Sequence, residues 1–181
     1  MNILAIDQAR NGAWCVYDYE QKKPVAYGAF AFPVDDFTYA QAMVGICDLT
    51  TELMEKYDIS AVFIEDIQLR KNADSFKKLA QLQGALVSMF ERNEYLYDFV
   101  PPSKWQSYCN ARGRTTKEIK AKMTELSPEK KQSKVLSIQF VKEQFGIETE
   151  DDNLADAICI GYFVTSTVAI QTVEEKENNN G

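Results

Sequence analysis

Three acidic residues interrupt apolar segments of this sequence. Asp7 ends the segment "NILAID", Glu65 lies near the end of "ISAVFIED", and Asp156 stands between two alanines in "NLADAICIG". We expect all three to be buried. A buried carboxylate lowers stability unless a cation, a hydrogen-bond donor or a shifted pKa compensates for the lost hydration. A shared chemical role therefore explains these positions better than packing does.

The chemistry open to these acids is limited because the chain contains no histidine. Ser-His-Asp and Cys-His nucleophile systems and histidine-ligated zinc are therefore excluded. The four cysteines lie far apart and include no C-x-x-C pair, which indicates neither a zinc site nor a disulfide framework. Oxygen ligands alone favour Mg²⁺ or Mn²⁺, and two such ions roughly 4 Å apart would suit phosphodiester hydrolysis by water.

The residues just before Asp156 leave the identity of a fourth ligand open. Asp152 and Asn153 lie four and three residues earlier, so a helix would carry both on the face of Asp156. Other acids at this helix start are explained by the helix dipole. An asparagine keeps an oxygen ligand but loses the charge. The candidate metal ligands are therefore Asp7, Glu65, Asp152, Asn153 and Asp156.

The elements that must position these residues form an α/β domain. Apolar patterning predicts three antiparallel strands first, then a helix, a strand, a helix, a strand and further helices, which describes a mixed five-stranded sheet with helices on both faces. Asn11 and Gly12 are a hairpin turn signal. The expected strands are 2–7, 13–19, 25–32, 59–66 and 96–102; the expected helices are 39–57, 75–91 and several up to about residue 169, with breaks near Gly113, Pro128 and Gly146. We expect one domain over residues 1–170 and a disordered tail over 171–181.

The charge of the chain is unevenly distributed. The net charge is −7, yet residues 101–145 hold ten basic and four acidic side chains. A smaller basic cluster, "RKNADSFKK", follows Glu65. Clustered basic residues are what a phosphate-binding face needs, although a solvated helix face remains an equally good interpretation of charge alone.

Four motifs together resemble the RuvC-type Holliday-junction resolvases of the ribonuclease H-like superfamily, phage-encoded relatives in particular. They are "ILAID", "FIED", "KNADSFKKLAQLQG" and "LADAICIG", in this order. The resemblance implies a ribonuclease H-like fold and a homodimeric, Mg²⁺-dependent endonuclease with two ions per site that nicks opposing strands of four-way DNA. It implies catalytic positions at Asp7, Glu65, Asn153 and Asp156. The candidate DNA contacts are Gln68, Arg70, Lys71, Lys104, Arg112, Arg114, Lys117, Lys131 and Lys134.

Three positions depart from that family pattern. Gln68 stands where bacterial members carry an aromatic residue suited to stacking on bases, and Asn153 stands where they carry a further acid. The "DPG" that commonly follows the first strand is "DQA" here. We therefore predict a slow or inactive resolvase. The alternatives are a non-catalytic branched-DNA binding protein with the same fold and another ribonuclease H-like nuclease.

The N-terminal sequence has no signal-like pattern, and no apolar run in the chain approaches the length of a membrane span. We therefore expect a cytoplasmic protein, which means the host cytoplasm if a phage encodes it.

Overall fold

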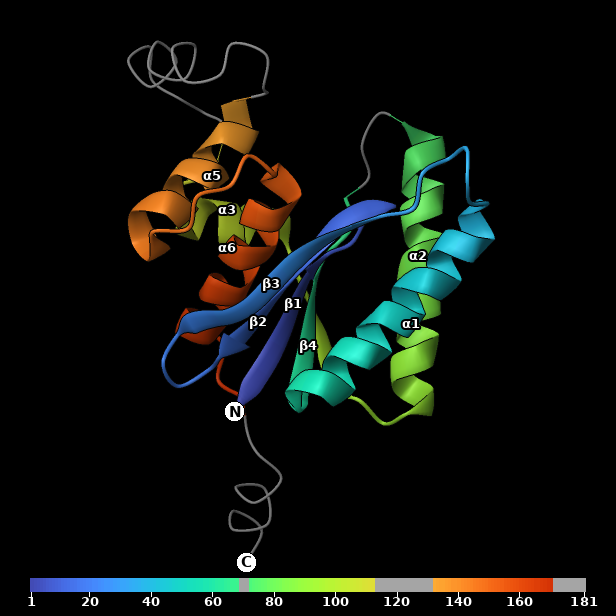
Figure 1. Ribbon diagram of the computed structural model, residues 1–181, viewed down its shortest axis with the longest axis horizontal. Helices are drawn as coiled ribbons and strands as arrows, with labels where there is room; N and C mark the ends of the chain where they lie inside the picture. The colour runs from blue at the N-terminus through green and yellow to red at the C-terminus, as the bar shows by residue number, and fades with distance from the viewer. Residues whose placement is uncertain (69–71, 113–131, 171–181) are drawn as a thin grey trace, which may run out of the picture.

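The computed structural model describes residues 1–68, 72–112 and 132–170 (Figure 1). Several expectations fall outside these ranges, namely the breaks near Gly113 and Pro128, the tail over 171–181 and the side chain of Lys134. The same holds for the expected DNA contacts Arg70, Lys71, Arg114, Lys117 and Lys131.

The sheet has five strands in the order β3-β2-β1-β4-β5. Strand β1 pairs antiparallel with β2 and parallel with β4, β2 pairs antiparallel with β3, and β4 pairs parallel with β5. This confirms the predicted mixed sheet with three antiparallel strands first. The strands are β1 (Asn2–Asp7), β2 (Asn11–Asp18), β3 (Lys23–Ala31), β4 (Ile59–Glu65) and β5 (Tyr97–Val100).

Helices cover both faces of the sheet (Figure 1). On one face lie α1 (Tyr39–Tyr57) and α2 (Ala73–Arg92), and on the other lie α3 (Pro102–Tyr108), α5 (Gln132–Phe145) and α6 (Asp152–Thr167). Each face has its own apolar core, because alternate residues of a strand point to opposite sides. In β1, Ile3 and Ala5 belong to the core beneath α6, whereas Leu4 and Ile6 belong to the core beneath α1 and α2. Among the described helices, none has the length and apolarity to cross a bilayer.

The prediction of a turn at Asn11 and Gly12 is wrong. Both residues lie in β2, and the turn from β1 is made by residues 8–10. Gly12 serves close packing instead, since a Cβ atom there would lie 2.4 Å from the Asp7 carbonyl oxygen and 2.7 Å from the ring of Phe30. A side chain at this position would displace the end of β1 or the Phe30 ring.

The start of α6 is fixed by local hydrogen bonds. Helix α5 ends before Gly146, as expected, and this glycine has a φ of 69°, which suits glycine best. Asp151 then caps α6, accepting hydrogen bonds from the backbone nitrogens of Asn153 (2.9 Å) and Leu154 (3.3 Å). The cap sets which residues of the first helical turn face the sheet.

Candidate active site

Parallel pairing of β1 with β4 brings Asp7 and Glu65 to the same edge of the sheet. Ile6 and Ile64 are partners in the register, and each acid follows directly in its strand. Asp7 continues the alternation of Ile3 and Ala5, so it points to the α6 side of the sheet. In β4, Glu65 continues the alternation of Ala61 and Phe63, so it also points to the α6 side. The strand register thus places both residues at one sheet edge, and the prediction that their carboxylates meet there stays a prediction.

Trp105 holds the carboxylate of Glu65. The indole nitrogen Nε1 donates a hydrogen bond of 2.9 Å to Glu65 Oε1, and the Trp105 side chain is only 1% exposed. Trp105 lies in α3, a short helix that begins at Pro102, just after β5. Because a buried indole has few rotamers and one donor, it constrains Glu65 strongly.

Two other side chains near this edge also make long-range bonds that sequence reasoning missed. Gln8 Nε2 donates to the backbone carbonyl of Glu65 at 2.8 Å, which ties the turn after β1 to the end of β4. Arg10 donates to the Phe32 and Phe37 carbonyls and, at 2.9 Å, to that of Pro33. The segment between β3 and α1 is thereby attached to the same turn.

The start of α6 reaches the same edge through Asn153. Its Nδ2 donates a 3.2 Å hydrogen bond to the carbonyl of Asn11, two residues before Ala13, which pairs with Asp7. A carboxylate at position 153 could not make this bond, since an ionised acid has no donor. The asparagine is therefore a structural tie between α6 and β2 at this position.

The burial of the acids only partly agrees with expectation. Asp7 is buried, at 8% exposed, whereas Glu65 and Asp156 are half-buried. Asp156 follows the buried Ala155 at the margin of the apolar face of α6, so part of the Asp156 side chain reaches solvent. One carboxylate oxygen of Asp152, Oδ2, is buried. Burial, with smaller contributions that include the Asp156 charge, raises the pKa of the Cys159 thiol one turn further along α6.

The donor set fits a hard divalent cation in kind, because it consists of carboxylate and amide oxygens. The side chains do not converge closely. Within residues 1–68, 72–112 and 132–170, no three acidic, cysteine or histidine side chains are close enough together to hold one ion. Glu65 is bonded to Trp105 of α3, and position 153 carries an amide where the family pattern has an acid.

A cleft of about 490 Å³ opens beside the acids. It is lined by Asp7 and Glu65 at the sheet edge and by the first turns of α2, and Gln68 lies on its wall as an exposed side chain. Lys104 is exposed but lines a different pocket, with Asp98 and Phe163. Arg112 is exposed as well. The DNA contacts expected of Lys104 and Arg112 stay predictions.

Comparison with known proteins identifies the family. A protein family described as "Lactococcus phage M3 protein" matches residues 2–166. Crossover junction endodeoxyribonuclease RuvC from Sulfurovum sp. (strain NBC37-1) is 30% identical over 141 residues, which are 76% of this chain and 88% of that relative. The chain belongs to this phage family of RuvC-type proteins.

Solved structures agree on the fold of this RuvC-type protein. Thermus thermophilus RuvC in complex with a Holliday junction substrate matches with a TM-score of 0.67 at 13% identity, covering 93% of this chain and 96% of that one. Fowlpox virus resolvase in complex with Holliday junction DNA matches with a TM-score of 0.51 at 13% identity, covering 94% and 100%. The ribonuclease H-like fold implied by the sequence is thus confirmed.

The bond from Trp105 to Glu65 makes a measurable prediction. Replacing Trp105 by Phe keeps a buried ring but removes the donor to a carboxylate, so we expect the free energy of unfolding to fall by about 1–3 kcal/mol at neutral pH. Urea denaturation of the wild type and the Trp105→Phe variant measures this loss. The Glu65→Leu background is the control, because leucine offers the indole no acceptor and the same change should cost clearly less there. Equal losses in both backgrounds would show that ring packing, and not the bond, accounts for the effect.

Proposed function

We propose that this RuvC-type protein is an endodeoxyribonuclease that resolves four-way and other branched DNA by metal-dependent phosphodiester hydrolysis. The observation that carries the proposal is the placement of Asp7 and Glu65 side by side, on the α6 side of the sheet edge. In support, the curated relative is named a crossover junction endodeoxyribonuclease, and the two solved neighbours are complexes with Holliday junction DNA.

Asp7, Glu65 and Asp156 would hold the ions, with Asp152 or Asn153 completing the set. When bound, Mg²⁺ or Mn²⁺ ions, two per site, supply an activated water and stabilise the leaving oxygen. The protein's own contribution is positional: Trp105 fixes the Glu65 rotamer. Asp7 is held in a buried position at the end of a paired strand, where a carboxylate attracts a cation more strongly than in water.

A four-way junction has two-fold symmetry, so a homodimer would place one site on each of two opposing strands. Exposed Lys104 and Arg112 are the proposed phosphate contacts within the described residues.

The proposed place of action is the host cytoplasm, in keeping with a family described by a phage protein.

A second candidate function is branched-DNA binding without cleavage. It is favoured by the amide of Asn153, which donates to the Asn11 carbonyl, at the position where the family pattern has an acid. A protein with α6 fixed in this way would keep its fold and its DNA-binding surface, but its metal site would lack one negatively charged ligand.

The first test is incubation of labelled four-way DNA with the protein. We expect symmetric nicks with Mg²⁺ or Mn²⁺, and binding without cleavage in excess chelator, because the acids need cations to meet the scissile phosphate. The Asp7→Asn variant is the control and should bind without cleaving. Cleavage in excess chelator would rule out the metal mechanism, and binding alone with Mg²⁺ would favour the second candidate. Preferential cutting of linear duplex or RNA–DNA hybrid would indicate another ribonuclease H-like nuclease.

A further prediction concerns the fourth ligand. Changing Asn153 to Asp adds the carboxylate that strengthens a hard-cation site but removes the donor to the Asn11 carbonyl. We expect Mg²⁺-dependent junction cleavage to rise several-fold, while stability without metal falls by about 1 kcal/mol. Junction cleavage and urea denaturation of the variant measure the two effects.

The matched variant for this prediction is Asp152→Asn, whose effect on cleavage should be smaller if position 153 is the ligand position. No gain from Asn153→Asp together with complete loss from Asp152→Asn would instead make Asp152, with its buried Oδ2, the fourth ligand.

A further inference from the structure

The cleft beside the acids has a second wall that the hydrolytic mechanism does not use. Its acidic side consists of Asp7, Glu65 and Asp66, and its other side is lined by Ile67 together with Phe76 and Leu79 of α2. Phosphate chemistry needs no apolar surface, so this wall calls for a different explanation.

The apolar wall is not part of either core of the protein. Ile67, Phe76 and Leu79 are all half-buried, and none of them packs against the core beneath α6 or the core beneath α1 and α2. The next apolar residue of α2 facing inward, Leu82, is fully buried in the second core. Phe76 therefore lies one and a half turns outside the packed part of the helix, with its ring available to the cleft.

An unsatisfied acceptor lines the same cleft. Gln8 is 5% exposed, and its amide orientation is fixed because Nε2 must face the Glu65 carbonyl. Its Oε1 is buried and has no hydrogen-bond partner among the described residues. A buried acceptor without a partner lowers stability, and the Gln8 side chain is kept in place by its bond to the Glu65 carbonyl. The cleft thus offers the aromatic face of Phe76, which suits a planar apolar group such as a nucleobase.

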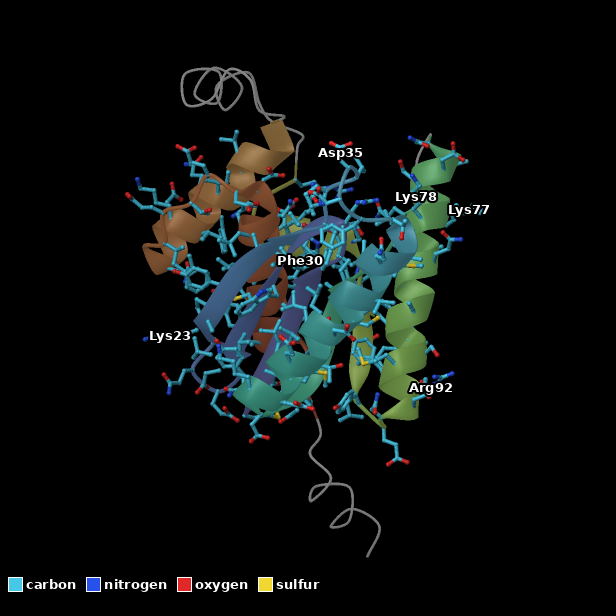
Figure 2. All side chains as sticks on the ribbon, turned by 45° about the vertical axis from the view of Figure 1, so that its right-hand side comes forward. Lys23, Phe30, Asp35, Lys77, Lys78 and Arg92 are labelled. Carbon is cyan, nitrogen blue, oxygen red and sulfur yellow. The ribbon has the colours of Figure 1, made fainter. Side chains whose placement is uncertain are left out.

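The start of α2 also carries positive charge. Lys77 and Lys78 follow Phe76 directly, and Figure 2 shows both in the first turns of the helix, at the end opposite Arg92. Lys78 Nζ lies 6.0 Å from the ring centre of Tyr39 in α1, and Lys77 is exposed. Neither lysine lines the cleft, so they add positive charge near it and not within it.

We propose that Phe76 stacks on a nucleobase that has left the duplex at the branch point, while the neighbouring strand passes over Asp7 and Glu65. This inference rests on the proposed function. Gln68, at the position where the family resemblance has an aromatic residue, is exposed and cannot stack in the same way. Phe76 would supply the missing aromatic surface from the helix that follows. Every base has a stacking face, so the contact selects for an unpaired base rather than for a sequence.

The test uses a four-way junction with 2-aminopurine at a branch-point position, and Ca²⁺ or chelator to prevent cleavage. With the wild type we expect fluorescence to change as the base stacks on Phe76. Phe76→Ala should abolish that change and weaken junction affinity about 10-fold, the effect of losing one stacked base. Affinity for linear duplex should stay the same, because it presents no unpaired base. Phe76→Trp should restore both signals, and Phe37→Ala, at an exposed aromatic in a separate groove, is the control.

The outcomes separate this inference from the function on which it rests. If the wild type cuts junctions and Phe76→Ala binds them with unchanged affinity and unchanged 2-aminopurine signal, the stacking role is wrong and the nuclease proposal stands. An equal loss of junction and linear binding in Phe76→Ala would also overturn the stacking role. If the wild type shows no preference for junctions over linear duplex, both proposals fail.

Discussion

Two carboxylates at the ends of neighbouring parallel strands are the constraint on which the rest of this structure depends. The strand pairing that holds Ile6 beside Ile64 fixes the backbones of Asp7 and Glu65 next to each other, so only their side chains can change the distance between the two carboxylates. The surroundings then fix the side chains: Gly12 lets β2 approach Asp7, and Trp105 binds Glu65. Two acids fixed on neighbouring strands beside a cleft are expected at a functional site.

The two faces of the sheet contribute different chemistry to one edge. Alternation along β1 and β4 turns Asp7 and Glu65 toward α6, whose first turn is tied to β2 by the bond from Asn153 to the Asn11 carbonyl. The cleft at this edge is lined by Asp7 and Glu65 and by the first turns of α2, which add the apolar side chains of Phe76 and Leu79. Metal-dependent hydrolysis and the proposed base stacking would therefore use neighbouring parts of one cleft at this sheet edge.

The sequence was sufficient to predict what depends on local patterning. Helix α1 begins and ends at the expected residues, Tyr39 and Tyr57, and Asp7 and Glu65 were recognisable because each charge ends an apolar strand. The turn at Asn11 was predicted wrongly because its signal is local, whereas Gly12 serves contact with Asp7 and Phe30.

The missed features join distant parts of the chain. The bonds from Trp105 to Glu65, from Gln8 to Glu65 and from Asn153 to Asn11 span 40, 57 and 142 residues. No periodicity encodes such pairs. The central claim, that Asp7 and Glu65 form a cation site, is tested most directly by thermal unfolding of the wild type and the Asp7→Asn variant over a Mg²⁺ titration. We predict a saturable rise in Tm for the wild type, because a ligand that binds only the folded state stabilises it, and little or no rise for the variant. Equal responses of the two proteins, or no response of the wild type, would contradict the account.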